Sequence, residues 1–258
     1  MDGTPTLQAE EITVGFGGLL ALDMVSMSVQ RGEIVGVIGP NGAGKTTLFN
    51  VICGFVRPAS GSLTYEGQPL HRHHPHDLAS LGIARTLQGV GLCRGLTVLE
   101  NTMLGAQPAL RSDVGSAMLG LWRSSREERR TRERALALLA RLGAADVAGR
   151  LPSTLPYGLQ KRVALARVLM AEPKLLLLDE PGSGLSSDDM DELADTIRSL
   201  SGDMAVLLVE HHMDLVMSLC HRLVVLNFGQ VIADGTPDEI RANRDVARAY
   251  LGDEVQSA

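Results

Sequence analysis

The segment Ile34–Thr46 constrains the fold of this chain most, because it joins an apolar run to a glycine-rich loop. The letters read IVGVIGPNGAGKT, and a helix is expected to follow. Glycines let the backbone curl so that its N–H groups face one point, and a helix N-terminus adds partial positive charge there. A strand, a loop of this kind and a helix in succession are typical of a phosphate-binding loop. The sequence therefore predicts an α/β protein with a nucleotide site at this loop.

Side chains within the loop have separate expected tasks. Lys45 reaches the β- and γ-phosphates of a nucleotide, and the Thr46 hydroxyl is a ligand for Mg²⁺. A glycine-rich turn before a helix is the alternative, but only three of the 258 residues are lysines, so a chance lysine at this position is rare. The residues expected to contact the nucleotide here are Gly39, Pro40, Asn41, Gly42, Ala43, Gly44, Lys45, Thr46 and Thr47.

The rest of the chain alternates apolar runs with amphipathic segments. Three runs, at 175–180, 205–210 and 223–227, read LLLLDE, AVLLVE and LVVLN. A helical pattern at 188–200 lies between the first two, with acidic residues in its first turn. Apolar strands that alternate with such helices indicate a parallel sheet covered on both faces. Shorter strands are predicted within 11–38, the first of them at Ile12–Phe16, and within 61–67. A mostly helical region is predicted from Gly89 to about Arg150, with one helix that opens at a capping box, Ser125–Glu128, and stops at Gly143.

Polar residues follow two of the apolar runs. Asp179 and Glu180 end the first, where a carboxylate of a parallel strand points into the ligand crevice. Asp179 is suited to hold Mg²⁺, and Glu180 to orient and deprotonate an attacking water. Taken alone, such a pair is more often an acidic turn after a strand, and only the loop at Gly39 favours the functional interpretation. Glu210-His211-His212 ends the second run, where a histidine could contact the γ-phosphate.

Composition excludes several other classes of protein. A net charge of −6 argues against a general nucleic-acid binder. Three scattered cysteines without a CxxC pair fit unpaired, buried thiols in a reducing compartment. Neither a signal-peptide pattern nor an apolar run of about 20 residues is present, which predicts a cytoplasmic protein that reaches a membrane only through a partner. The four histidines within His71–His76 lack supporting ligands and are interpreted as a polar loop.

Together these segments resemble the ATP-binding cassette (ABC) family over nearly the whole chain. Within it, the similarity is strongest to the ATP-binding subunits of branched-chain amino acid importers. The runs that carry this resemblance are GPNGAGKTTLFN, GIARTLQGVGLCRGLTVLEN, LLLLDEPGSGL, VLLVEHHMDLVM and DGTPDEIRANRDVARAYLG. The family fold implied is a P-loop NTPase (RecA-like) core with an antiparallel β subdomain at 1–88 and 171–258, and an inserted α-helical subdomain at 89–170, in one domain spanning 1–258.

The resemblance also implies roles for further residues. Gln88 corresponds to the loop glutamine that contacts Mg²⁺ and the lytic water, and Phe16 to an aromatic that stacks on adenine, although a core phenylalanine is the alternative. His211 matches the switch histidine, whereas His212 stands where the subgroup usually has Asp. Residues Gly89–Asn101 are expected to receive a coupling helix of the permease.

One segment departs from the family pattern. The signature usually reads Leu-Ser-Gly-Gly-Gln, or Leu-Ser/Ala-Tyr-Gly-Gln in the subgroup, and here it is LPYGL at 155–159. In the family this segment caps the ATP held by the other subunit, so Tyr157 and Gly158 are expected to act in trans. Pro156 removes a hydroxyl and an N–H donor but suits the first turn of a helix. Leu159 replaces the expected Gln, and Ser186 stands where many relatives carry Asp.

The main hypothesis is an ATP-hydrolysing importer subunit that binds ATP and Mg²⁺ at the cytoplasmic face of the membrane. Its expected partners are integral-membrane permease subunits, a second ATP-binding subunit forming a homodimer or heterodimer, and indirectly an extracytoplasmic solute-binding protein, with no nucleic acid. One alternative is a cassette with weakened hydrolysis that pairs with a different ATP-binding subunit. A non-transport ABC ATPase is the third hypothesis, although such proteins usually have tandem cassettes or a coiled-coil arm. The solute is left open, with branched-chain amino acids, urea and amides as candidates.

Overall fold

The structure is a computed structural model that describes residues 4–70, 73–86, 89–109, 123–202 and 204–256. Its contacts divide the chain into two compact units. The first comprises residues 1–78, 174–183 and 190–258, and the second comprises 79–173 and 184–189. None of the helices among the described residues combines the length and the apolar character needed to cross a membrane.

The first unit holds most of the strands. They are β1 (Leu7–Phe16), β2 (Leu19–Val29), β3 (Ile34–Ile38), β4 (Ser60–Tyr65), β5 (Gln68–Pro69), β7 (Leu175–Asp179), β8 (Ala205–Val209), β9 (Arg222–Asn227) and β10 (Gln230–Gly235). Its helices are α1 (Lys45–Ile52), the 3₁₀ turn η1 (Pro75–Asp77), most of α7 (Ser187–Leu200), α8 (Met213–Leu219), α9 (Pro237–Ala242) and α10 (Arg244–Gln256).

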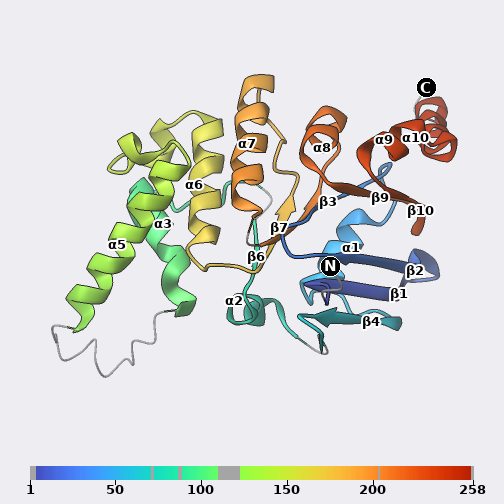
Figure 1. Ribbon diagram of the computed structural model, residues 1–258, viewed down its shortest axis with the longest axis horizontal. Coiled ribbons are helices and arrows are strands. Elements are labelled where there is room, and N and C mark those ends of the chain that lie inside the picture. The colour runs from blue at the N-terminus through green and yellow to red at the C-terminus, as the bar shows by residue number, and fades with distance from the viewer. Residues whose placement is uncertain (1–3, 71–72, 87–88, 110–122, 203, 257–258) are drawn as a thin grey trace. The chain divides into compact units, whose positions relative to one another are not determined.

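Five strands of the first unit are hydrogen-bonded in the order β10-β9-β3-β8-β7, with β3 parallel to both of its neighbours. Every residue of β3 and β8 is buried, because these runs are apolar on both faces. Figure 1 shows α8 and α9 on one side of these strands, and α1 with the antiparallel sheet on the other. The predicted α/β fold is confirmed. In register, Val209 pairs with both Val37 and Asp179, so the carboxyl ends of β3, β8 and β7 are level.

A second sheet of the first unit is antiparallel, in the order β2-β1-β4-β5. β1 begins at Leu7, five residues before the strand start predicted from the apolar run at Ile12. The missed residues pair with β2 on one side and β4 on the other, and Leu7 and Ala9 are buried. Their alternation is broken by a register shift at Glu11, which has φ +50°. This irregularity hides the period of two that a sequence pattern relies on.

The second unit is mainly helical. It contains α2 (Leu78–Leu81, whose first residue belongs to the first unit), β6 (Ile83–Arg85), α3 (Val98–Met103), α5 (Arg123–Arg141), α6 (Tyr157–Leu169) and the 3₁₀ turns η2 (Leu104–Ala109), η3 (Ala145–Val147) and η4 (Pro152–Thr154). The helix expected to open at a Ser125 cap begins two residues earlier, so that prediction is wrong in position. Its predicted stop is confirmed, since Gly143 has φ +66°, a conformation that favours glycine.

Two of the three cysteines fit the prediction of buried free thiols and one does not. Cys53 and Cys220 are buried, and burial raises the pKa of the Cys220 thiol to about 12. Cys93 is exposed, because it lies in the loop that precedes α3. All three are free.

Arg222 joins four segments of the first unit. Its guanidinium donates to Glu33 Oε1 at 2.8 Å, to both carboxylate oxygens of Asp234 at 2.8 Å, and to the carbonyl oxygen of Ser28. Burial lowers the pKa of Arg222, but the hydrogen bonds to Glu33 and Asp234 outweigh it and raise the pKa overall. The guanidinium thus links β9, β10 and the start of β3 to β2.

We expect Arg222→Ala to lower the free energy of unfolding by about 2–3 kcal/mol, because several hydrogen bonds to charged groups are lost together. Arg248→Ala is the matched control, since Arg248 forms an exposed pair with Asp245 at 3.2 Å. Urea unfolding of both variants measures the difference. Equal stabilities would contradict a structural role for the Arg222 network.

Candidate active site

A cavity of about 620 Å³ opens in the first unit beside the loop that follows β3. Its walls come from the β1–β2 hairpin, the phosphate-binding loop with the first turn of α1, the end of β7 and the β9–β10 turn. The lining residues are Phe16, Leu19, Leu20, Ala21, Asn41, Gly42, Ala43, Gly44, Lys45, Thr46, Thr47, Glu180 and Phe228. Most of the residues predicted to contact a nucleotide therefore surround one space.

The glycines of this loop are required by its backbone. Gly39 has φ +148°, and a Cβ there would lie 2.0 Å from the carbonyl oxygen of Leu226. Gly44 caps α1 with φ +105°, and a Cβ there would lie 2.6 Å from the carbonyl oxygen of Ala21. The N-terminus of α1 has no side-chain cap and no acidic residue in its first turn. Its N–H groups are thus left to face an anion.

Lys45 and Thr46 begin α1 at the edge of the cavity. The Lys45 ammonium donates to the carbonyl oxygens of Gly39, at 2.6 Å, and Pro40, at 2.7 Å, which hold it over the loop. Thr46 is exposed. A lysine held above a curl of backbone amides suits a phosphate chain, because the ammonium is a compact charge with three donors.

Asp179 is the last residue of β7 and Glu180 follows it, at the level where β3 and β8 also end. Glu180 has φ +47°, a left-handed conformation that non-glycine residues seldom adopt, and its N–H donates to Val209 O at 2.9 Å. Such conformations gather at functional sites, where the surrounding structure fixes them. The Asp179 carboxylate and the Thr46 hydroxyl are oxygen donors of the kind that Mg²⁺ prefers, so the residues present fit this ion. Gln88, the other predicted ligand, lies outside the described residues.

The residues after β8 differ in exposure. Glu210 is buried, His212 is partly buried, and His211, the predicted γ-phosphate contact, is exposed. His212 Nδ1 is hydrogen-bonded to Glu210 Oε1, and the two imidazole rings have centroids 4.1 Å apart. His212 is therefore held by the buried carboxylate of Glu210, whereas His211 extends into solvent.

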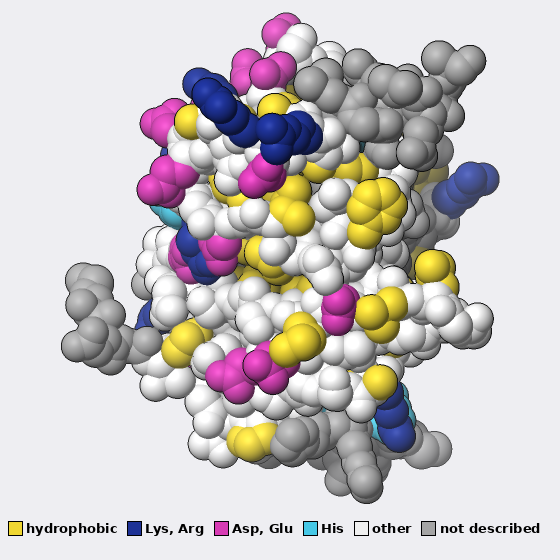
Figure 2. Space-filling view, turned by 90° about the vertical axis from the view of Figure 1, so that its right-hand side faces the viewer, with side chains coloured by type: hydrophobic (Ala, Val, Ile, Leu, Met, Phe, Trp, Pro, Cys, Tyr) yellow, Lys and Arg dark blue, Asp and Glu magenta, His cyan; other side chains and the backbone are white. Residues whose placement is uncertain are grey.

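Hydrophobic side chains border the cavity away from the phosphate loop. Phe16 is 51% exposed, which excludes the alternative of a core phenylalanine, and Phe228 is 81% exposed. Figure 2 shows hydrophobic side chains dispersed among charged ones on the face at the right of Figure 1. Sequence reasoning missed Phe228, although an aromatic residue beside Gly229 in a turn between two strands is a usable signal for an exposed contact.

Tyr250, on α10, was also missed. Its hydroxyl is hydrogen-bonded to the backbone of Gly39 at the start of the phosphate-binding loop. Burial raises the pKa of this hydroxyl, and the bond to Gly39 acts in the opposite direction. The sequence AYLG pointed to the subgroup, but only the folded chain brings position 250 beside position 39.

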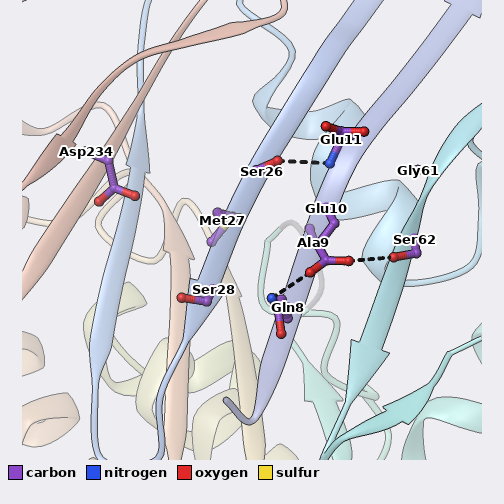
Figure 3. A pocket seen from close by; sticks show the side chains of 10 residues that line it. All are labelled: Gln8, Ala9, Glu10, Glu11, Ser26, Met27, Ser28, Gly61, Ser62 and Asp234. Carbon is purple, nitrogen blue, oxygen red and sulfur yellow. Dashed lines mark hydrogen bonds between the residues drawn. The ribbon is translucent and has the colours of Figure 1, made fainter. Parts of the chain in front are cut away.

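A larger open groove of about 840 Å³ lies on the antiparallel sheet (Figure 3), and its chemistry is unsuited to a phosphate. Glu10 lies on its floor, accepting from Gln8 at 2.8 Å and from Ser62 at 3.2 Å. Glu11 and Asp234 add further negative charge. Like charges repel, so an anionic nucleotide is disfavoured here.

The signature segment belongs to the second unit. Pro156 is the N-cap of α6, with φ −54° and ψ 150°, so it stands one position before the first helical turn in which the sequence predicted it. Gly158 is buried, and a Cβ there would lie 2.6 Å from Asp189 Oδ1. Ser186 donates to Asp189 Oδ2 at 2.8 Å and accepts from Asp189 N at 3.2 Å, which caps α7. Tyr157 remains 40% exposed.

The sequence matches two family descriptions. Residues 22–183 match "ABC transporter", and residues 230–256 match "Branched-chain amino acid ATP-binding cassette transporter". The chain is 39% identical to the high-affinity branched-chain amino acid transport ATP-binding protein BraF of Pseudomonas aeruginosa, over 96% of this chain and 98% of that protein. The corresponding protein LivG of Escherichia coli K12 is also 39% identical, with the same coverage.

Solved structures give the same result. The ADP conformation of MJ1267, an ATP-binding cassette of an ABC transporter, has a TM-score of 0.83 and 32% identity, covering 96% of this chain and 99% of that one. A dimeric post-hydrolysis state of the ATP-binding cassette MJ0796, bound to ADP and Pi, has a TM-score of 0.72 and 25% identity, covering 90% and 98%. The predicted P-loop NTPase fold is therefore confirmed, and the chain belongs to the ABC transporter family as one of its ATP-binding cassettes.

Proposed function

We propose that this chain binds and hydrolyses ATP to energise uptake of branched-chain amino acids or related small polar solutes through a membrane permease. The observation that carries the proposal is the meeting of the phosphate-binding loop, Asp179, Glu180 and His211 at the carboxyl ends of adjacent strands. The subgroup match over residues 230–256 and the names of the relatives support the solute class. The chain is proposed to act at the cytoplasmic face of the membrane as a peripheral subunit.

In the proposed mechanism, the amides of the loop and the Lys45 ammonium bind the β- and γ-phosphates. Thr46 and Asp179 would hold Mg²⁺, with Gln88 as a further ligand, and that ion would neutralise charge on the phosphate oxygens. Glu180 accepts a proton from the attacking water as the water oxygen bonds to the γ-phosphorus. The bond between the γ-phosphorus and the β,γ-bridging oxygen breaks, and that oxygen leaves on ADP. His211, extended into solvent, contacts the γ-phosphate when a second cassette closes on the site.

A second ATP-binding subunit is part of the proposal, because none of the signature residues 155–159 lines the cavity beside this chain's own phosphate-binding loop. Tyr157 and the first N–H groups of α6 are proposed to cap the ATP of the partner cassette. The solved dimeric cassette with 25% identity supports such pairing.

The loop that precedes α3 is proposed to receive the coupling helix of the permease. Asn101 is buried and shapes this loop through hydrogen bonds to Cys93 N at 2.7 Å and to the carbonyl oxygens of Cys93, Leu96 and Thr97, each at 3.0 Å. Arg167 donates to Gly91 O at 2.7 Å, and burial lowers its pKa. A loop held by several internal bonds is suited to rigid docking. Solute selection is assigned to the permease and to an extracytoplasmic binding protein.

The direct test is co-expression with a candidate permease pair and a solute-binding protein in membrane vesicles. We expect uptake of a radiolabelled branched-chain amino acid that depends on ATP inside the vesicle and on Lys45. Uptake of urea or a short amide instead would redirect the solute class, and no ATP-dependent uptake of any of them would refute transport.

A second candidate function is a cassette with weakened hydrolysis that requires a different, fully active partner. Pro156 favours it, because the position lacks the serine hydroxyl that bonds the γ-phosphate in relatives. An ordinary rate of ATP hydrolysis by the purified chain alone would exclude this version.

We expect Phe16→Ala to raise the KM for ATP about 5- to 150-fold, because stacking of a base on an aromatic ring contributes about 1–3 kcal/mol. Phe16→Trp restores the stacking surface and is expected to restore the KM. Phe55→Ala is the matched control, since Phe55 is 61% exposed but does not line the cavity. Equal KM values for all three variants would place the adenine elsewhere.

A further inference from the structure

Three consecutive side chains after β8 form a cluster of potential metal ligands. Glu210, His211 and His212 each offer one ligand atom, and these atoms lie within 4.8 Å of one another. Tetrahedral bonds of about 2.0–2.1 Å separate ligand atoms by roughly 3.4 Å, so a metal ion requires the exposed imidazole to move closer and the hydrogen-bonded Glu210–His212 pair to open slightly. Among the described residues, this is the one such group of three.

The buried carboxylate gives an independent indication of a cation. The Glu210 side chain is fully buried, and its Oε1 is hydrogen-bonded to His212 Nδ1. Its Oε2 has no hydrogen-bond partner within the described part of the chain. An unpartnered carboxylate oxygen that is removed from water costs free energy, which a bound cation would offset. Charge and burial therefore favour a positive ion at this point.

Gly182 packs closely against the pair, and a Cβ there would also lie 2.9 Å from Leu215 Cδ2. A Cβ at Gly182 would lie 3.0 Å from Glu210 Oε1 and 3.4 Å from His212 Nδ1. Any larger residue at position 182 would occupy the volume beside both ligand atoms. The described residues thus combine a buried anion and two imidazoles, with a glycine packed closely against them.

We propose that Glu210, His211 and His212 bind a late first-row divalent metal ion, with Zn²⁺ as the ion used to test it. Two imidazole nitrogens and one carboxylate oxygen suit Zn²⁺, Ni²⁺ or Cu²⁺ better than Mg²⁺, which prefers oxygen ligands. Binding replaces the hydrogen bond between Glu210 Oε1 and His212 Nδ1 by bonds to the ion, and the proton of that hydrogen bond passes to solvent. The fourth position of a tetrahedral site is left for water.

Occupation of this site would restrain His211. A ring bound to the ion can no longer extend to a γ-phosphate, so the ion would slow ATP turnover reversibly. This consequence rests on the proposed role of His211 in hydrolysis, whereas binding itself does not. Metal binding and turnover are therefore measured separately.

The binding experiment uses the full chain without nucleotide, titrated with Zn²⁺ in a calorimeter. The chain is compared with and without His212→Asn. Both versions also carry His74→Gln and His76→Gln, which remove two other imidazoles that could bind Zn²⁺. We expect His212→Asn to weaken binding at least about tenfold, since even supporting residues of metal sites cost that much. Asn is tolerated at this N-cap position of α8, so the variant is expected to fold. The absorption spectrum of bound Co²⁺ identifies the type of ligand. We expect a spectrum typical of nitrogen and oxygen ligands, without a band from a thiolate ligand.

Unchanged Zn²⁺ affinity in His212→Asn, or a thiolate band with Co²⁺, would overturn the site. The turnover experiment uses the assembled transporter in excess Mg²⁺. We expect micromolar Zn²⁺ to inhibit ATP hydrolysis, a chelator to restore it, and His212→Asn to resist inhibition. Zn²⁺ that binds at the site without slowing turnover would overturn the link to His211 and leave the binding site supported.

Discussion

Glu180→Gln in the assembled transporter is expected to lower ATP turnover by about 10²–10⁴-fold, the range that a positioned general base contributes. Glutamine has nearly the same shape and can still orient water, but it cannot accept a proton. ATP affinity is expected to be retained, because the proposed phosphate contacts come from the loop after β3 and from Lys45. The variant should therefore hold ATP without hydrolysing it, and single-turnover assays with labelled ATP separate binding from cleavage.

Glu11→Gln is the matched control for this experiment. Glu11→Gln is the same isosteric substitution in the same unit. The backbone conformations of the two positions are also similar, with φ +50° at Glu11 and +47° at Glu180. It is exposed on β1 and does not line the cavity. We expect ordinary turnover in this control. Turnover near the wild-type rate in Glu180→Gln would remove Glu180 from the role of base.

Pro156→Ser is expected to strengthen ATP-dependent closure of two cassettes, and so to raise ATPase activity at limiting ATP. The restored hydroxyl would bond the γ-phosphate of the partner's nucleotide, and a hydrogen bond to a charged group contributes about 1.5–3 kcal/mol, or roughly 10- to 150-fold in affinity. The backbone of Pro156, with ψ 150°, already has the extended conformation of a serine N-cap. Steady-state ATPase assays across ATP concentrations measure the change.

Pro156→Ala distinguishes the hydroxyl from the regained N–H. Alanine restores the donor without the hydroxyl and caps a helix poorly, so we expect it to show little or none of the gain. The serine hydroxyl could instead accept a hydrogen bond from an N–H group in the first turn of α6, which would stabilise the helix without raising turnover. A Pro156→Ser variant with unchanged or lower activity would mean that the proline is accommodated without loss.

Much of the site could be predicted because its parts are local in sequence. The loop at Gly39–Thr46 specifies its own backbone through glycines, and a lysine and a threonine stand at fixed positions within it. Asp179 and Glu180 directly follow an apolar run, so their place at a strand end needs no tertiary information. The apolar runs themselves predicted buried parallel strands, since only a strand covered on both faces is continuously apolar.

Other features could not be predicted, because they depend on residues distant in the chain. Phe228 borders the same cavity as Phe16 only because β9 packs beside β3. Tyr250 reaches the backbone of Gly39 through the position of α10. The early start of β1 was missed because a register shift at Glu11 disrupts its alternation.

Sequence alone determined that this chain is an α/β ATP-binding cassette. The glycines of the phosphate-binding loop and the apolar residues of each buried strand are contiguous in the chain, so they can be recognised without tertiary information. The tertiary structure decided how individual groups are poised. Glu180 has a left-handed backbone conformation, and Glu210 Oε2 is buried without a hydrogen-bond partner among the described residues. His211 is exposed, beside a His212 that is hydrogen-bonded to Glu210. Burial and pairing are properties of neighbours in space, so a pattern along the chain cannot supply them.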